Sequence, residues 1–164
     1  MKRFERSLWL SVACVAAWGG YVYGQSRALS APPDPTHISF VLAKDMKWEG
    51  DPAGGQVHVN LIGDPVKPGL YIRLAKWLPG HYSHPHFHDI ERYFYVVSGA
   101  WWVSSSKTYD PALTFPMPAG TFVTDYANKV HFDGANKEDG VILEIGVGPM
   151  KSTSCNTRAD CAAR

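Results

Sequence analysis

The amino-acid sequence predicts an all-β domain. Short runs rich in Val, Ile, Leu and aromatic residues recur along the chain, and turn-forming Gly, Pro and Asp residues separate them. No long stretch keeps a helical period. Among 164 residues, 15 are Gly and 12 are Pro, more than a helix bundle tolerates, and 13% are aromatic. Strands spaced in this way are typical of a β-sandwich or a β-barrel.

Residues 1–31 carry the three-part pattern of a secretory signal peptide. Lys2, Arg3 and Arg6 form a basic start, residues 8–18 are almost entirely apolar, and small or weakly polar residues follow. The apolar run is shorter than the roughly 20 residues of a membrane-spanning helix. We therefore expect a cleaved signal and a periplasmic or secreted protein without membrane association. The alternatives are an uncleaved N-terminal membrane anchor and a lipoprotein attached to the membrane through Cys14.

The remaining chain divides into one domain and a tail. Residues 30–36 (SAPPDPT) indicate a linker, because proline suits neither a helix interior nor a central strand. We expect a β-barrel over residues 32–150 and a polar, loosely ordered C-terminal tail over 151–164. Strands are expected at residues 38–43, 56–62, 70–77, 92–98, 100–105, 120–126 and 140–147.

Charge and cysteine content narrow the function classes. The whole chain has 16 basic and 15 acidic residues, and removal of residues 1–31 takes four basic and one acidic residue, which leaves 12 and 14 and a net charge of −2. Nucleic acid is therefore not an expected partner, because its binders carry a basic excess. Cys155 and Cys161 lie together in the tail. An oxidising compartment favours a disulfide between them, and a metal-binding pair is the alternative.

Histidines gather in one short segment. Four of the seven lie within eight residues, at His81, His84, His86 and His88. Neutral imidazole is the commonest protein ligand for transition metals. Because residues i and i+2 of a strand share a face, His86 and His88 project side by side. His84 has the same parity, although Pro85 interrupts the strand. The segment predicts a metal site, and the alternative is a solvated histidine-rich loop.

Around these histidines the sequence resembles the cupin superfamily of small β-barrels. The first cupin motif is Gly, five residues, His-x-His, three or four residues, Glu, six residues and Gly. Gly80, His86, His88 and Gly99 match this spacing. One residue departs from the motif, because Arg92 stands where the family has its Glu ligand.

The second cupin motif is matched in part. Gly120 and His131 stand at the family spacing, whereas Tyr126, Asn128 and Ala135 replace the Pro, Gly and Asn of the motif. Two motifs in the right order make the resemblance specific for the fold and weaker for an activity.

The resemblance covers roughly residues 68–148. It implies a single-domain cupin barrel, that is, a double-stranded β-helix or jelly roll, behind the signal peptide. It also implies that His86, His88 and His131 hold one divalent transition metal per chain. We expect Cu, Zn, Fe or Mn, and an oxidising compartment favours copper or zinc over ferrous iron.

The family's fourth ligand is missing at its position. Strand parity turns Glu91 away from the face of Arg92, unless a bulge reverses it. His84 is a candidate replacement, and Glu144 is a candidate outer ligand or partner of a ligand. Arg92 has three open interpretations: it binds an anionic substrate group in catalysis, it pairs with a buried acid such as Glu144, or it reaches the barrel mouth without a chemical role.

Three functions agree with these expectations. The first is an exported mononuclear-metal cupin, an oxidoreductase that uses O₂ or peroxide on a small molecule or an extracellular carbohydrate or other polymer. The second is a non-catalytic periplasmic metal- or ligand-binding protein, a sensor or carrier. The third is a metal-free barrel that binds a ligand through Arg92 and aromatic residues. An outward stripe of Tyr93 and Tyr95 favours a homodimer, which is common among cupins.

Overall fold

A computed structural model describes residues 31–155 and 161. The chain separates into two units, residues 1–40 and 41–164, which are described separately. The predicted signal peptide lies outside the described residues except for Ala31, so it stays a prediction. Within the described part of the chain, no helix has the length and apolar character needed to span a membrane.

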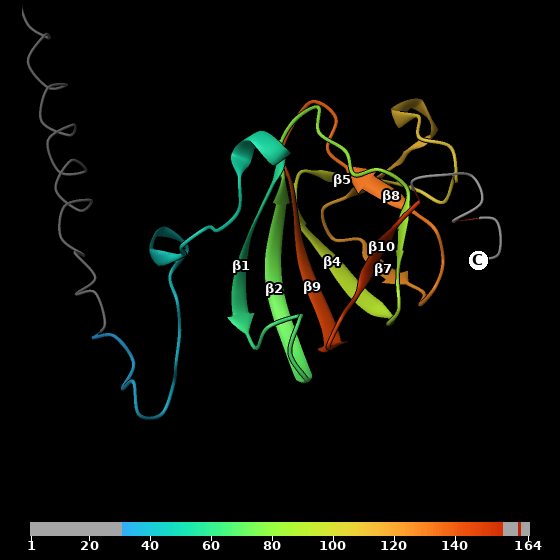
Figure 1. Cartoon of the computed structure of the whole chain (residues 1–164). Helices are drawn as coiled ribbons and strands as arrows, with labels where there is room; N and C mark the ends of the chain where they lie inside the picture. The colour runs from blue at the N-terminus through green and yellow to red at the C-terminus, as the bar shows by residue number, and fades with distance from the viewer. Residues whose placement is uncertain (1–30, 156–160, 162–164) are drawn as a thin grey trace, which may run out of the picture. The chain divides into compact units, whose positions relative to one another are not determined.

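The larger unit consists of strands and loops, as the sequence predicts (Figure 1). Short 3₁₀ helices occur at Ala43–Asp45, Pro52–Gly54 and Pro111–Leu113, and the described residues contain no α-helix. The strands are β1 (Gln56–Ile62), β2 (Gly69–Trp77), β3 (His86–His88), β4 (Arg92–Ser98), β5 (Ala100–Ser104), β6 (Phe115–Pro118), β7 (Phe122–Asp125), β8 (Phe132–Gly134), β9 (Gly140–Gly148) and β10 (Ser152–Ser154).

Three antiparallel sheets are formed. The five-stranded sheet has the order β1-β2-β9-β4-β7, the three-stranded sheet has the order β6-β5-β8, and β10 pairs with β3. Strand β9 therefore lies between β2 and β4, and its Glu144 stands opposite Arg73 on one side and Phe94 on the other. The β4–β7 register places Arg92 opposite Asp125. The sheet pairing thus gathers charged residues from distant parts of the chain.

The turn between β4 and β5 requires glycine. Gly99 closes the first sequence motif and has φ 65°, in the left-handed region that residues with a Cβ rarely adopt. A Cβ at this position would overlap the carbonyl oxygen of Asp139. The motif glycine therefore fixes the connection from the five-stranded sheet to the three-stranded sheet.

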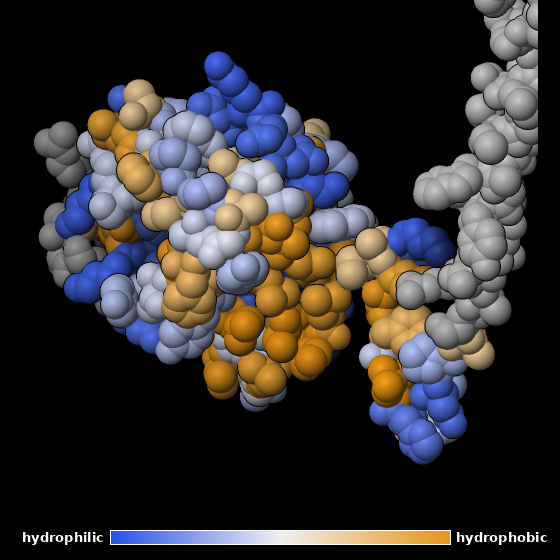
Figure 2. Space-filling view, turned by 180° about the vertical axis from the view of Figure 1, so that it is seen from behind, coloured by the Kyte–Doolittle hydropathy of each residue, from blue (hydrophilic) through white to orange (hydrophobic). Residues whose placement is uncertain are grey.

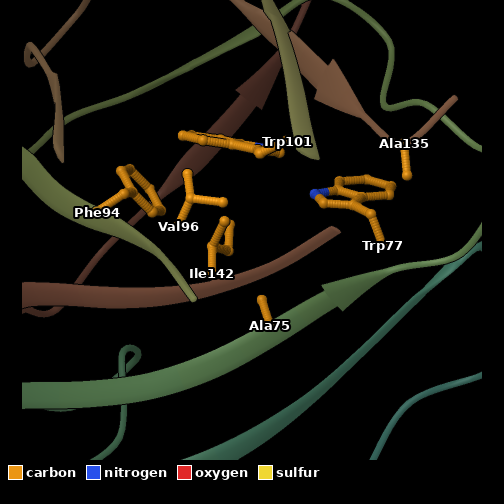
Figure 3. Packing of buried hydrophobic residues seen from close by; sticks show 7 residues of the cluster. All are labelled: Ala75, Trp77, Phe94, Val96, Trp101, Ala135 and Ile142. Carbon is orange, nitrogen blue, oxygen red and sulfur yellow. The ribbon is translucent and has the colours of Figure 1, made fainter. Parts of the chain in front are cut away.

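The apolar core lies between the two larger sheets (Figure 3). Inward-facing residues of the five-stranded sheet meet side chains from the other sheet, and the cluster consists of Ala75, Trp77, Phe94, Val96, Trp101, Ala135 and Ile142. The rings of Phe94 and Trp101 lie 4.7 Å apart between centroids. Burial of a large apolar side chain contributes about 1.5–3 kcal/mol relative to exposure, so this cluster is a main source of stability.

One carboxylate is embedded in the core. Asp133 of β8 accepts hydrogen bonds at Oδ2 from Trp77 Nε1 at 2.9 Å and from Trp101 Nε1 at 2.8 Å. Its Oδ1 accepts one from the hydroxyl of Ser83 at 2.9 Å. Buried polar groups are costly without partners, so this network joins β2, β5 and β8. Trp102, which follows Trp101 on β5, is half-buried.

The expected strand at residues 38–43 is absent. Ile38, Phe40 and Leu42 are about half exposed, and the segment runs as a loop into the first 3₁₀ helix. Its apolar composition suited a strand. No described strand pairs with it, however, and a strand needs a ladder partner to satisfy its backbone.

The described residues of the expected C-terminal tail are more ordered than the sequence suggests. Residues 152–154 form β10, with Ser152 opposite His88 and Ser154 opposite His86. The Cys155 N–H donates to the carbonyl of Pro85 at 2.9 Å. Cys155 and Cys161 form the predicted disulfide, and Cys161 packs in a small cluster with Phe87 and Val130. The segment is therefore fastened onto β3.

Apolar side chains also remain on the outside of the barrel. Leu70 and Val147 are register partners on β2 and β9, and they are 52% and 64% exposed. Tyr93 and Tyr95 on β4 are 40% and 47% exposed, as the expected outward stripe requires. Figure 2 shows a face of the molecule on which apolar side chains gather in one area. The expected outward stripe of Tyr93 and Tyr95 is therefore exposed, and the homodimer that would cover it stays a prediction.

Candidate metal site

Three histidines converge inside the barrel. His86 and His88 stand at the two ends of β3, and His131 precedes β8. His86 and His131 exchange two backbone hydrogen bonds of 2.9 Å, which hold the two segments side by side. One ligand nitrogen from each histidine lies within 4.8 Å of the others. The structure thus brings together the three residues that the sequence motifs single out, and we call them the histidine trio.

Two rings of the trio are oriented through their Nδ1 atoms. His86 Nδ1 lies 2.8 Å from the carbonyl oxygen of His84. His131 Nδ1 lies 3.1 Å from the carbonyl oxygen of Lys129 and 3.2 Å from Asp125 Oδ1. These oxygens only accept hydrogen bonds, so each Nδ1 carries the hydrogen and each Nε2 keeps its lone pair. The arrangement leaves the Nε2 lone pair of His86 available as a ligand, whereas the Nε2 lone pair of His131 faces Arg92 Nη2 at 3.2 Å.

The third ring has an unsatisfied nitrogen. His88 Nδ1 is buried and has no hydrogen-bond partner. Burial, and then the positive charge of Arg92, lower the pKa of His88 to about 2, and burial also lowers the pKa of His86. An unpaired buried polar group costs about 1–3 kcal/mol. A transition metal binds imidazoles through a nitrogen lone pair, so the trio fits such an ion once the Nε2 lone pair of His131 is released from Arg92.

Arg92 is buried beside the trio and is held by two acids. Its Nε and Nη2 donate to Asp125 Oδ2 at 3.1 and 2.6 Å, and its Nη1 donates to Glu144 Oε1 at 3.2 Å. Its Nη2 also lies 3.2 Å from His131 Nε2. Burial alone would lower the pKa of Arg92, but Glu144 and Asp125 outweigh it and raise that pKa. Of the three interpretations of Arg92, the structure therefore contains its pairing with a buried acid. The side chain does not extend to the barrel mouth.

Glu144 is the centre of this charge network. It is 1% exposed and accepts hydrogen bonds from Tyr71 Oη at 2.9 Å and Arg73 Nε at 2.6 Å, besides the one from Arg92. Burial, followed by the charge of Glu144, raises the pKa of Tyr71. Glu144 thus contacts Arg92, the neighbour of His131, and is not a member of the histidine trio.

Two expected candidates occupy other positions. The side chain of His84 is exposed and stacks on Tyr109, with 4.4 Å between ring centroids. Its contribution to the trio is the backbone carbonyl that orients His86. Glu91 is exposed and accepts a hydrogen bond from the hydroxyl of Tyr93. Neither side chain belongs to the trio.

Sequence reasoning missed Tyr71 and Arg73. Strand alternation puts both on one face of β2, which is the inward one. The opposite face carries the apolar residues Ile72 and Leu74, so the alternation of side chains alone did not tell which face of the strand points inward. A buried arginine needs a carboxylate partner. An arginine at an inward position of β2 therefore predicts an acidic residue on a neighbouring strand, and this signal could have identified the pair.

Comparisons with known proteins bear on the fold. No protein-family model and no curated protein matches the sequence. Among solved structures, the polyketide cyclase RemF from Streptomyces resistomycificus matches 76% of this chain and 89% of its own, with 18% identity and a TM-score of 0.61. KdgF from Halomonas sp. matches 67% and 93%, with 20% identity and a TM-score of 0.53. A cupin 2 conserved barrel domain protein from Rhodopseudomonas palustris matches 66% and 71%, with 16% identity and a TM-score of 0.52.

Proposed function

Because this chain has the cupin fold, we propose that it is a metal-dependent enzyme that holds one transition metal through His86, His88 and His131. The observation that carries the proposal is the convergence of three imidazoles, one of which has a buried nitrogen without a partner. Copper, zinc, iron and manganese are the candidate ions, since imidazole suits the first three best and cupins also use the fourth.

The finer proposal is an oxidoreductase that uses O₂ or peroxide on a small molecule or an extracellular carbohydrate or other polymer. A metal held by three side chains keeps open positions and supplies Lewis acidity or electron transfer when bound. The carbonyls of His84 and Lys129 keep the His86 and His131 rings oriented. Arg92 places a fixed positive charge 3.2 Å from His131, where it stabilises negative charge that develops in a reaction.

The second candidate is a non-catalytic periplasmic sensor or carrier. One observation favours it: the guanidinium of Arg92 already donates to Asp125 and Glu144, which leaves few donors for a substrate. Consumption of O₂ or peroxide by the metal-loaded protein with candidate substrates separates the two. Turnover supports the enzyme, and tight metal or ligand binding without turnover supports the carrier.

We further propose that the protein is exported to the periplasm or the medium and forms a homodimer. The basic and apolar pattern of residues 1–31 and the Cys155–Cys161 disulfide support export. The exposed Tyr93 and Tyr95 support the dimer. N-terminal sequencing of the protein recovered from the periplasm tests the first proposal, and sedimentation equilibrium tests the second.

Elemental analysis of protein purified from the periplasm tests the metal proposal. We expect about one transition-metal ion per chain in the natural protein, because the trio forms one mononuclear site. The double variant His86→Ala/His131→Ala should hold none. His84→Ala is the matched control, since it removes a nearby histidine side chain outside the trio and should keep the metal. A natural protein that takes up none of the four ions on incubation would overturn the proposal.

A further inference from the structure

The outer face of the five-stranded sheet is apolar across four neighbouring strands. Side chains alternate between the two faces of a strand, so the residues that alternate with the buried ones of β2, β9 and β4 point outward. The strand registers align these outward residues in rows. One row runs from Leu74 through Leu143 and Tyr95 to Phe122 of β7. We call the outward residues of β2, β9, β4 and β7 the outer face.

Much of the outer face is exposed. Six of its residues are between 40% and 64% exposed, namely Leu70, Tyr93, Tyr95, Val97, Phe122 and Val147. Figure 2 shows apolar side chains gathered in one area of the molecule. The largest apolar patch on a typical monomer covers about 300–600 Å² and often has a function. An apolar patch that crosses four strands therefore indicates a surface that a partner covers.

The exposed apolar area is close to what a dimer interface needs. If an aromatic side chain offers about 200 Å² and an aliphatic one about 100 Å², these six residues expose roughly 450 Å². A standard interface buries about 800 Å² on each partner, and about 65% of a homodimer interface is apolar, which is roughly 520 Å². The half-buried Leu143 and Ile145 in the centre of the face supply part of the difference. The outer face thus has the area that a second copy of this chain requires.

The few charges of the outer face are placed so that a copy of the same face can pair with them. Lys76 is the one charged residue among the outward residues of the four strands, all of which the structure describes. It stands opposite Val141, in the row at one end of the face. The exposed Glu91 precedes β4 with the same parity as Tyr93 and therefore lies at the opposite end. Opposite charges at opposite ends favour a partner that is the same surface turned around.

We propose that a second copy of this chain packs its own outer face against this one, in a dimer with two-fold symmetry. The inference rests on the homodimer proposed above and assigns its surface and its axis. In such a contact residue i meets residue j and j meets i. An axis that lies in the face, crosses β9 between Leu143 and Ile145 and is perpendicular to the line from Lys76 to Glu91 brings Lys76 of each copy to Glu91 of the other.

Sedimentation equilibrium of the natural protein and of Tyr95→Lys tests the surface. With strands about 4.8 Å apart and about 6.8 Å between alternate residues, the axis passes close to Tyr95. A lysine there would therefore meet its own copy inside an apolar interface. The dissociation constant of the dimer should rise at least about 100-fold, because like charges that face each other in an interface are strongly unfavourable. Val97→Lys is a second variant on the same face and should act in the same direction.

Phe115→Lys is the matched control. Phe115 is 66% exposed and lies on β6 of the three-stranded sheet, outside the outer face. The variant adds the same charge in place of an exposed aromatic ring and should change the dissociation constant less than about twofold. Urea unfolding of each variant shows that it is folded under the conditions of the sedimentation experiment.

Charge reversal tests the axis. Lys76→Glu and Glu91→Lys should each raise the dissociation constant about tenfold at low salt, because each reversal turns two attractive contacts of the dimer into repulsive ones. The double variant Lys76→Glu/Glu91→Lys restores opposite charges at both contacts. Its dissociation constant should return to within about threefold of the natural value.

The outcomes are distinct. A natural dimer that Tyr95→Lys and Val97→Lys both leave intact would overturn the inference and leave the homodimer standing on another surface. A protein that stays monomeric up to about 100 μM would overturn the homodimer as well. Equal weakening by Phe115→Lys would show that the effect is not confined to the outer face and would also overturn the inference. A double charge variant that dissociates more readily than either single one would overturn the assigned axis.

Discussion

Two buried carboxylates in this barrel are satisfied in opposite ways. Asp133 receives hydrogen bonds from the two indole N–H groups of Trp77 and Trp101 and from a serine hydroxyl. Glu144 receives them mainly from the cations Arg73 and Arg92. Neutral donors satisfy a carboxylate without cancelling its charge, whereas guanidinium groups do both.

The difference assigns separate roles to the two regions. The Asp133 region joins sheets around the apolar core and keeps a negative charge there. The Glu144 region is nearly neutral as a whole, but its cation Arg92 lies against the histidine trio. Stability experiments should therefore find both regions important, with the larger loss in the cationic region.

The largest expected effect is on the cationic region. Arg92→Met removes the shared partner of Asp125 and Glu144 and leaves both acids buried with fewer partners. Breaking a buried ion pair from one side costs about 3–5 kcal/mol. Urea unfolding of the metal-free protein measures it. A loss below about 1 kcal/mol would show that the guanidinium is not an essential partner.

A smaller loss is expected in the neutral-donor region. Asp133→Asn keeps an oxygen that can accept from the indoles of Trp77 and Trp101 but removes the charge that strengthens both bonds. Hydrogen bonds to charged groups are worth about 1.5–3 kcal/mol and neutral ones about 0.5–1.5, so we expect a loss of about 2 kcal/mol. The same urea experiment compares the two variants. A loss from Asp133→Asn that equals the loss from Arg92→Met would remove the contrast between the regions.

Acid should weaken the metal-free protein through His88. Its pKa is about 2 in the folded protein and 6.5 in the unfolded chain, so the unfolded chain binds the proton first as pH falls. This stabilising term is therefore complete above pH 6.5 and is lost progressively toward the folded pKa, by up to about 1.4 kcal/mol per pH unit. Unfolding free energies across this window, with His88→Asn as the comparison, measure the slope. An unchanged slope in the variant would assign the acid sensitivity to other groups.

The smallest effect is expected at Tyr71. Tyr71→Phe removes one hydrogen bond of 2.9 Å to Glu144 and leaves the two cations in place. A single hydrogen bond contributes about 0.5–1.5 kcal/mol, so the loss should fall in that range. A loss as large as that of Arg92→Met would mean that the hydroxyl, and not the cations, dominates the environment of this carboxylate.

The long strands and the histidine trio were predictable, while the charge network was only partly so. Alternating apolar runs identified β1, β2, β4 and β9, and two motifs singled out the members of the histidine trio. The Arg73–Glu144 contact joins residues 71 positions apart, and the Arg92–Asp125 contact joins residues 33 apart. Such contacts depend on sheet order and register, which short-range patterns do not encode. For the same reason, the sequence predicted the pairing of Arg92 with Glu144 only as one of three interpretations of Arg92.

The shortest strands were missed because they have too few residues for a periodic signal. Strands β8 and β10 contain three residues each. Their existence depends on partners elsewhere in the fold. The segment 38–43 shows the converse case, since its composition suits a strand but no described strand pairs with it.

The pairing of β10 with β3 has a consequence for how proteolysis would affect the protein. Two of the three histidines stand on this strand, which pairs along its length with β10, a segment that follows the last strand of the five-stranded sheet, while His86 also bridges His131. A protease that cuts between Gly148 and Ser152 would therefore leave every strand of that sheet intact while freeing the support of His86 and His88. If the histidine trio holds the proposed ion, nicked molecules should release it before they unfold, so metal content would report such a cut earlier than a measurement of folding.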